Sequence, residues 1–292
     1  MNQYTLSEVG GQVLERAFLG MRLSIYKDDK VWVQPLDSDI EEVFDPKRNK
    51  LFRKGEVIRW ILENDKGEVV GRVAAFVDPV TFKKGEPPVG GVGFFECINS
   101  QEAANMLLDA AKHWLQAKGM EGMDGPVNFG DRDRWWGCLK DGFIEPTYCM
   151  NYNPPYYNDL FEGYGFQNYF NQYTYTRPIS TEGIADALLE RGMRLEANSS
   201  YKFKNADLRN LDKLAQDFNI VFNKAWGKFV GAGDMTLANT KLLIKAMKPI
   251  LDEKLLYFAF HEGEPIGFFL MIPDLNQAAR QLNGRFDWWG KL

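Results

Sequence analysis

The sequence predicts a mixed α/β fold, in which a buried strand leads directly into an amphipathic helix. The strand is the apolar run over residues 92–98, and the helix follows it without a spacer. Residues 12–26 show a second amphipathic helical period, and residues 57–77 contain two strand-like runs around a turn. We therefore expect a mixed central sheet flanked by helices, followed by a partial second copy of the same pattern.

The strand–helix unit carries its own start and stop signals. Asn99 with Glu102 in the same turn is typical of a capping box, and Gly119 ends the predicted helix 100–118. The apolar positions of this helix recur on one face; they are Ala103, Ala104, Leu107, Leu108, Ala111, Trp114 and Leu115. Because the first N–H groups of a helix have no partner within it, the start of this helix can also hold an anion.

The other predicted elements follow from hydrophobic period and turn residues. Before the strand–helix unit they are a short strand at 4–9, the helix 12–26, a loop with short helical turns at 27–54, and hairpin strands at 57–63 and 68–77. After it they are a strand near 122–129, an irregular segment at 130–157, a short helix at 159–164, a β-rich segment at 166–177, and a helix at 181–191 that Gly192 stops. The second half repeats strand, helix, helix and hairpin at 201–203, 208–226, 237–254 and 255–272.

Two similar hairpins indicate an internal duplication. Their turn glycines are Gly67 and Gly263, and an amphipathic helix precedes each hairpin. Two unrelated hairpins would leave a similar pattern, because hairpins are common. We predict a first domain at 1–178, a connecting helix at 179–199, and the N-terminal half of a second domain at 200–292. On this interpretation the second copy stops before its own strand–helix unit.

Composition and charge argue against several classes of protein. A chain of 292 residues with a net charge of −5 does not suit the coating of nucleic acid. No apolar run approaches the roughly 20 residues of a membrane span, and no secretory signal is visible, so we expect a cytoplasmic protein with no membrane partner. The 3 cysteines and 2 histidines lack metal or disulfide spacing, so no metal is expected. Exposure of Trp288 and Trp289 would allow a homodimer.

Several stretches resemble the GNAT superfamily of acyl-CoA N-acyltransferases. The order of elements over residues 4–177 is similar to that family, and runs such as DGPVNF and MNYNPPYYNDLFEGYGF resemble a group of bacterial tandem GNAT-like proteins. The resemblance implies an acyl-CoA that enters beside the central strand and a small-molecule amine that accepts the acyl group. The coenzyme-binding residues that we expect lie at the end of that strand and the start of its helix; they are Phe95, Cys97, Ile98, Asn99 and Ser100.

Two departures from the family pattern predict that the first copy is degenerate for coenzyme A binding. Family members carry Arg/Gln-x-x-Gly-x-Gly/Ala between strand and helix, whereas this chain reads CINSQEAAN and places the charge of Glu102 there. Phe161 stands where a tyrosine general acid often lies, and a phenyl ring donates no proton. The sequence therefore leaves the catalytic residues unassigned.

The irregular segment is the strongest candidate for a ligand-binding surface. Flat amphipathic rings beside arginine and asparagine suit a small polar or amine ligand. The expected substrate-binding residues are Asn128, Asp131, Arg134, Trp135, Trp136, Tyr152, Asn153 and Tyr156. The alternative is an ordered loop whose aromatic rings cover the sheet and whose charges pair with one another.

Two functions remain open from the sequence. The first is the transfer of an acyl group from acyl-CoA to an amine, which rests mainly on the resemblance. The second is a non-catalytic module that binds a ligand or a protein on a GNAT-like fold, which the two departures favour. The acceptor, the acyl group and the oligomeric state are not determined by the sequence.

Overall fold

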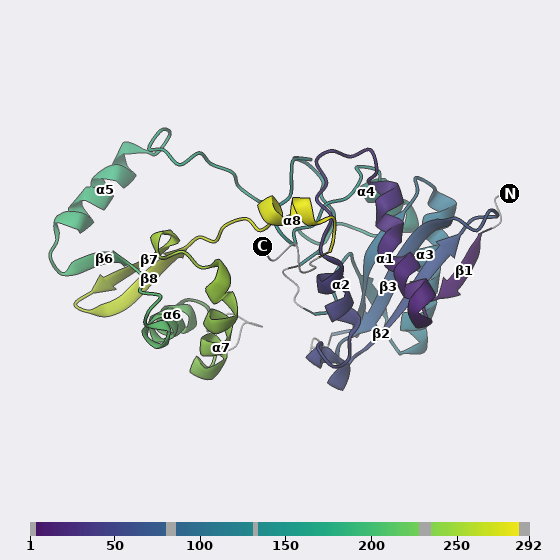
Figure 1. Ribbon diagram of the computed structural model, residues 1–292, viewed down its shortest axis with the longest axis horizontal. Coiled ribbons are helices and arrows are strands. Elements are labelled where there is room, and N and C mark those ends of the chain that lie inside the picture. Colours follow the sequence, from purple (N-terminus) through teal and green to yellow (C-terminus); the bar gives the residue numbers. More distant parts are fainter. Residues whose placement is uncertain (1–3, 80–85, 131–133, 228–234, 286–292) are drawn as a thin grey trace. The chain divides into compact units, whose positions relative to one another are not determined.

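The computed structural model describes residues 4–79, 86–130, 134–227 and 235–285 (Figure 1). The chain forms two compact units, which are described separately. The first unit runs to Asn171 and also takes in the chain from Asp274 onward, and the second is Gln172–Pro273. The predicted second domain at 200–292 differs from the second unit at its C-terminal end, because the described residues 274–285 belong to the first unit.

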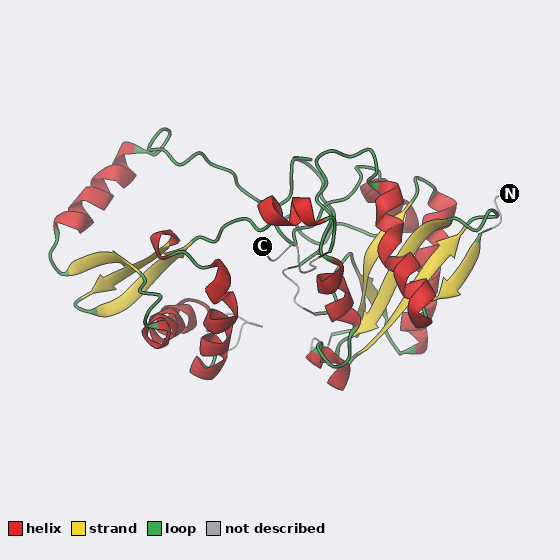
Figure 2. Ribbon diagram, in the orientation of Figure 1, coloured by secondary structure: helices red, strands yellow, loops and turns green. Residues whose placement is uncertain are grey.

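A five-stranded mixed sheet forms the centre of the first unit (Figure 2). Its strands, in both sequence and spatial order, are β1 (Thr5–Glu8), β2 (Glu56–Glu63), β3 (Val69–Val77), β4 (Val89–Cys97) and β5 (Gly122–Asp124). The first four strands are antiparallel neighbours, whereas β4 and β5 run parallel. The two parallel strands pair only from Val89 to Gly91 on β4, so the rest of β4 has no β5 neighbour.

Helices cover both faces of this sheet. The helices of the first unit are α1 (Gly11–Ile25), α2 (Asp37–Phe44), a short 3-10 helix (Lys50–Arg53), α3 (Gln101–Ala117), α4 (Tyr157–Tyr164) and α8 (Asn276–Leu282). Phe18 of α1 packs with Ile61 and Ala74 on one face, and α2 adds Val43 beside Phe76 there. On the opposite face, α3 and α4 pack against the larger core cluster.

The packing of α3 follows from its apolar stripe. Ala103, Ala104, Leu107, Leu108 and Ala111 are each 0% exposed, as the period of the sequence predicts. The helix begins one residue later than the predicted cap, because Ser100 is the N-cap and its hydroxyl accepts a hydrogen bond from the Ala103 N–H at 3.3 Å. Asn99 is therefore not the capping residue.

A bulge interrupts β4 in the middle of the sheet. The pairing with β3 shifts between Gly93 and Glu96, and Phe94 within the bulge has φ of 50°. The ring of Phe94 contacts Phe44 at 5.0 Å between centroids. On its other side β4 approaches the loop after β5 closely, since the N–H of Val127 donates to Val92 O at 2.8 Å. The bulge and this approach shape the end of β4 where a cavity begins.

The second unit contains a three-stranded antiparallel sheet in the order β6-β7-β8. Its elements are α5 (Asp186–Ala197), β6 (Tyr201–Asn205), α6 (Leu211–Trp226), α7 (Leu237–Met247), short 3-10 helices (Lys248–Ile250 and Glu253–Leu255), β7 (Leu256–His261) and β8 (Glu264–Leu270). The order strand, helix, helix and antiparallel hairpin matches β1, α1, α2, β2 and β3 of the first unit. The tandem pattern inferred from the two hairpins thus recurs in the three-dimensional structure.

These elements confirm the predicted fold class, a mixed α/β sheet of GNAT-like topology flanked by helices. Two further local predictions, besides the cap at Asn99, were wrong. No strand forms over the described residues 166–177, where the aromatic side chains of Tyr169, Tyr173 and Tyr175 are exposed; a strand needs a neighbour for its N–H and C=O groups. Helix α5 runs through Gly192 instead of stopping there.

Short helices precede β2, as predicted. The segment 27–54, which we expected to be a loop with short helical turns, contains the two-turn helix α2 and the short 3-10 helix. Two acidic residues in its first turn, Asp37 and Asp39, suit the positive end of the helix dipole. The buried Ile40 and Val43 anchor this helix on the sheet, and its start contributes to the cavity wall.

Candidate functional site

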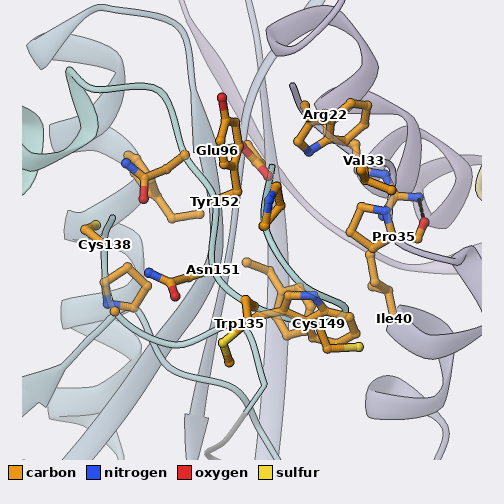
Figure 3. A pocket seen from close by; sticks show the side chains of 18 of the residues that line it. Arg22, Val33, Pro35, Ile40, Glu96, Trp135, Cys138, Cys149, Asn151 and Tyr152 are labelled. Atoms are coloured by element: carbon orange, nitrogen blue, oxygen red, sulfur yellow. Dashed lines mark hydrogen bonds between the residues drawn. The ribbon is translucent and has the colours of Figure 1, made fainter. Parts of the chain in front are cut away.

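A cavity of about 100 Å³ lies beside the end of β4, past the last residue that β5 pairs (Figure 3). Arg22, Val33, Pro35 and Ile40 line one side of it, and Cys138 and Asn151 lie on the opposite side in this view. The remaining lining residues are Trp32, Arg72, Phe94, Phe95, Glu96, Pro126, Trp135, Gly137, Pro146, Thr147, Tyr148, Cys149, Met150, Tyr152, Asn153, Tyr157 and Asn276. The cavity is therefore mostly apolar, with two guanidinium groups and one carboxylate in its wall.

Glu96 on β4 is the carboxylate in this wall, and hydrogen bonds from three elements hold it. The hydroxyl of Tyr157 donates to Oε2 at 2.8 Å, and the hydroxyl of Tyr26 donates to the same oxygen at 3.0 Å. Arg72 on β3 reaches Oε1 at 3.3 Å. The side chain of Glu96 is 12% exposed. Both oxygens are thus fixed in position at the edge of the cavity.

Burial perturbs the acid–base properties of this cluster. Desolvation raises the pKa of Glu96, while the charge of Arg72 and the hydrogen bonds from Tyr157 and Tyr26 oppose part of that shift. Burial and the negative charge of Glu96 likewise raise the pKa of both tyrosines. Glu96 is therefore a stronger base than an exposed glutamate, and the tyrosines stay protonated as hydrogen-bond donors.

Arg22 on α1 supplies a second guanidinium, which interacts electrostatically with Arg72. It is 1% exposed, and its Nη2 donates to the carbonyl oxygen of Pro35 at 3.3 Å and pairs with Asp37 at the start of α2. Burial, followed by the positive charge of Arg72, lowers the pKa of Arg22 to about 10. Arg22 therefore remains cationic near neutral pH.

Of the predicted substrate-binding residues, Trp135, Tyr152 and Asn153 line the cavity. The backbone N–H of Trp135 donates to the backbone carbonyl oxygen of Cys149 at 2.9 Å. The centroid of the Trp135 ring lies 5.8 Å from that of Phe94. The hydroxyl of Tyr152 donates to Asp29 at 2.7 Å. Asn153 is buried, and its Oδ1 accepts a hydrogen bond from the Leu139 N–H at 2.6 Å, so this amide orders the loop.

The other predicted substrate-binding residues lie outside the cavity wall. Asn128 is buried at 2% exposure, Arg134 is exposed, and Trp136 packs on Phe170. The hydroxyl of Tyr156 donates to Cys97 O at 2.8 Å. Asp131 falls outside the described residues. The irregular loop therefore contributes a cavity wall, but only part of the expected set converges on it.

Of the predicted coenzyme-binding residues, Phe95 lines the cavity, and the others lie at or beyond the end of β4. The N–H of Cys97 donates to the Tyr157 hydroxyl at 2.9 Å, and its carbonyl accepts from Tyr156. Ile98 donates its N–H to Val70 O at 3.0 Å. A thioester carbonyl that accepts a hydrogen bond from the Cys97 N–H must first displace the Tyr157 hydroxyl.

The start of α3 does not fit a pyrophosphate cradle of the family type. Asn99 is exposed. The Ser100 hydroxyl accepts the hydrogen bond of the Ala103 N–H, so this N–H is not free to bind a phosphate. Glu102 places a carboxylate in the first turn. Phe161, at the position of the family tyrosine, is 5% exposed and packs against Phe95 at 4.8 Å between ring centroids. We therefore assign no coenzyme contacts here.

The described part of the chain shows neither a metal-binding cluster nor a membrane-spanning helix. It contains no cluster of three or more histidine, cysteine, aspartate or glutamate side chains that could hold a metal ion. None of the helices in these ranges is both long and apolar enough to cross a bilayer. Burial raises the pKa of Cys97 to about 12, so this thiol stays protonated near neutral pH.

Sequence reasoning missed the three charged residues of the cavity. Each is a single charge at a position that the pattern assigns to the core: Arg22 in the stripe of α1, Arg72 within the apolar strand VVGRVAAFV, and Glu96 within GVGFFECI. A lone charge in a buried apolar run needs a partner or a function, because desolvation is costly. That signal was present in the sequence.

Two curated proteins are similar to this chain over most of its length. The "Bacterial ceramide synthase" of Caulobacter vibrioides (strain NA1000 / CB15N) is 26% identical over 281 residues, which cover 95% of this chain and 72% of that protein. "Protein YghO" of Escherichia coli (strain K12) is 23% identical over 288 residues, which cover 95% of this chain and 70% of that protein. No family model matches the sequence.

Solved structures of low sequence identity are also similar. A tandem GNAT protein from the clavulanic acid biosynthesis pathway is 10% identical, with a TM-score of 0.45 over 91% of this chain and 73% of that protein. A GCN5-related glucosamine N-acetyltransferase region of a fungal multi-domain protein is 13% identical, with a TM-score of 0.45 over 92% of this chain and 27% of that protein.

Proposed function

We propose that this chain is a GNAT-type N-acyltransferase, which transfers an acyl group from acyl-CoA to an amine, and that Glu96 accepts the proton of the amine. The observation that carries this proposal is the buried carboxylate of Glu96, held at the edge of a cavity beside β4. The GNAT-like topology of the first unit supports the reaction class. A relative named as a ceramide synthase, similar over 95% of this chain, supports the amine acceptor.

The role of Glu96 follows from the chemistry of amide formation. An amine that becomes an amide nitrogen must lose a proton, and a base within hydrogen-bond reach of the nitrogen can accept it. Glu96 is the carboxylate in the cavity wall, and burial raises its pKa toward that of an effective base. When bound, an acyl-CoA supplies the acyl group as an activated thioester.

The surrounding hydrogen bonds position this base. Tyr26 and Tyr157 both donate to Oε2, and Arg72 holds Oε1. These contacts come from the end of α1, from α4 and from β3, so movement of Glu96 would break hydrogen bonds to three elements. A fixed base avoids the reorganisation that a mobile side chain would need in the transition state.

The acceptor that we propose is a long-chain amino alcohol, and the product a fatty amide. A ceramide is the amide of such an alcohol with a fatty acid, so the name of the bacterial relative points to this class. The apolar wall of the cavity, which includes Trp32, Val33 and Ile40, suits the carbon atoms next to the amine. We do not assign the binding of the coenzyme A part of the acyl-CoA to residues 95–100, because polar groups of Cys97 and Ser100 already form hydrogen bonds within the protein.

A non-catalytic binding module is the second candidate function. The two tyrosine hydroxyls on the backbone of Cys97 favour it, because they occupy groups at the end of β4. In that case the cavity would bind an amine ligand without turnover. The two functions share a ligand and differ in whether an amide forms.

The experiment is an amide-formation assay on the purified protein with a fatty acyl-CoA and a long-chain 2-amino alcohol, followed by mass spectrometry. We expect amide product and free coenzyme A in equal amounts. Glu96→Gln should lower the rate by about 10²–10⁴-fold. Glu121→Gln, the same change at an exposed glutamate, is the control and should leave the rate unchanged. Binding of the amine without any amide product would favour the second candidate.

A further inference from the structure

Buried donors without partners mark one side of the cavity. Among the buried side-chain nitrogen and oxygen atoms of the described residues, only Nε and Nη1 of Arg22, Nε of Arg72 and Oδ1 of Asn128 lack a hydrogen-bond partner. Both arginines line the cavity (Figure 3 shows Arg22), and they are 1% and 3% exposed. Buried donors of native proteins are nearly always satisfied, so these N–H groups are available to an oxygen acceptor that enters the cavity.

The position of Arg22 relative to Glu96 limits what can supply that oxygen. Both side chains line the same small cavity, and the opposite charge of each favours the ionised form of the other. If the acceptor amine lies at Glu96, an oxygen on an adjacent carbon of the same molecule lies in the same cavity of about 100 Å³ that Arg22 lines.

The charges around Arg22 and Glu96 indicate whether the ligand oxygen belongs to an acid or to a neutral group. Arg22 pairs with Asp37, and Arg72 pairs with Glu96, so the four charges already balance. A carboxylate or phosphate would add an uncompensated negative charge in a desolvated site. A hydroxyl or ketone oxygen accepts the N–H groups without changing the charge.

We propose that the unpartnered guanidinium N–H groups of Arg22 select an acceptor that carries a hydroxyl or ketone oxygen on the carbon next to its amine. This inference rests on the proposed function for the identity of the acceptor, and it makes Arg22 the residue that determines specificity. A site built to hydrogen-bond a substrate oxygen rejects the analogue without it, since the analogue leaves buried donors unpaired.

The test compares three soluble amines of equal chain length: 2-aminodecan-1-ol, 2-aminodecane and 2-aminodecanoic acid. Calorimetric binding to the whole protein, without acyl-CoA, measures affinity independently of turnover. We expect the wild-type protein to bind the amino alcohol about 10- to 100-fold more tightly than 2-aminodecane. Tighter binding of the amino acid than of the amino alcohol would overturn the choice of a neutral oxygen.

Two variants of Arg22 separate recognition from folding. Arg22→Met removes the donors, and Arg22→Lys keeps the charge beside Asp37 while it removes the planar guanidinium. Both should lose the discrimination and bind the amino alcohol and 2-aminodecane within about twofold of each other. Arg59→Met is the matched control: Arg59 is 17% exposed, pairs with Glu15 and does not line the cavity, so discrimination should stay intact.

The outcomes separate this inference from the proposed function. If binding discriminates between the amines through Arg22 but no amide forms, the proposed acyltransferase activity is contradicted and the proposed recognition by Arg22 is supported. Amide formation at equal rates from the amino alcohol and 2-aminodecane would overturn the recognition site and keep the acyltransferase. A folded Arg22→Lys protein that loses affinity for all three amines equally would show a merely structural role.

Discussion

The hydroxyl of Tyr157 donates a hydrogen bond to Oε2 of Glu96 at 2.8 Å. The same hydroxyl accepts a hydrogen bond from the backbone N–H of Cys97, the residue after Glu96, at 2.9 Å. One phenol therefore connects α4 with the end of β4. Tyr157 is 2% exposed, so water does not compete for either bond. This contact both closes the edge of β4 and stabilises the ionised form of Glu96.

Tyr157→Phe should shift the pH dependence of amide formation. A donor to a carboxylate favours its charged form, so loss of the donor should raise the pKa of Glu96 further. The acidic limb of kcat/KM should move to higher pH. The unpaired N–H of Cys97 should also lower the free energy of unfolding by about 1–3 kcal/mol. Rate–pH profiles and thermal melting measure the two effects.

Tyr164→Phe is the matched control for that variant. Tyr164 lies at the end of the same helix, and its hydroxyl donates to Asp109 at 2.7 Å, away from Glu96. The pH profile of this variant should coincide with that of the wild type. Equal shifts in both variants would point to a general effect on α4 and contradict a direct role of the Tyr157 hydroxyl.

Glu96 should also make folding stability fall as the pH rises. Its pKa is raised in the folded protein, so the folded state binds this proton more tightly than the unfolded state. The contribution of Glu96 to the free energy of unfolding is fully present below the ordinary pKa of a glutamate. It is lost as the pH rises through the raised pKa of the folded state. Unfolding of Glu96→Gln should lack this decline. Parallel curves for the two proteins between these pH values would rule out the raised pKa.

The affinity for acyl-CoA should depend on its acyl chain more than on its phosphates. The start of α3 lacks the glycines of a pyrophosphate cradle and carries Glu102. We therefore expect free coenzyme A to bind at least about tenfold more weakly than a fatty acyl-CoA, since each buried methylene contributes roughly 0.8 kcal/mol. Calorimetry with both molecules tests this. Equal affinities would show that the phosphates supply the binding energy after all.

The local pattern of the sequence was enough to predict most elements of the first unit. The stripe of α3, the hairpin of β2 and β3, and the helix α1 each follow a period that depends only on neighbouring residues. The bulge at Phe94 left no such trace, because it arises from pairing between β3 and β4. The extent of β5 likewise depends on its contact with β4.

The candidate site was only partly predictable for a similar reason. Trp135 and Tyr152 were expected from composition, and both line the cavity. The cluster around Glu96 joins residues that are far apart in the chain, since Tyr26 and Tyr157 lie 70 and 61 positions away from it. Only the fold brings them together. Isolated charges in apolar runs are the signal that would have directed attention to this cluster.

The loop after β5 approaches β4 most closely at Gly93. A Cβ atom at Gly93 would lie 1.8 Å from the carbonyl oxygen of Val127, a backbone atom that cannot move aside cheaply. Gly93→Ala should therefore lower the free energy of unfolding by about 3 kcal/mol and disturb the adjoining cavity. Gly20→Ala, inside α1, is the control, because no heavy atom lies within 4 Å of its added Cβ. That change should instead stabilise the protein by roughly 0.5–1 kcal/mol, since alanine favours the helix. Urea denaturation of both variants measures the difference, and a Gly93→Ala protein as stable as the wild type would mean that the loop after β5 does not abut β4.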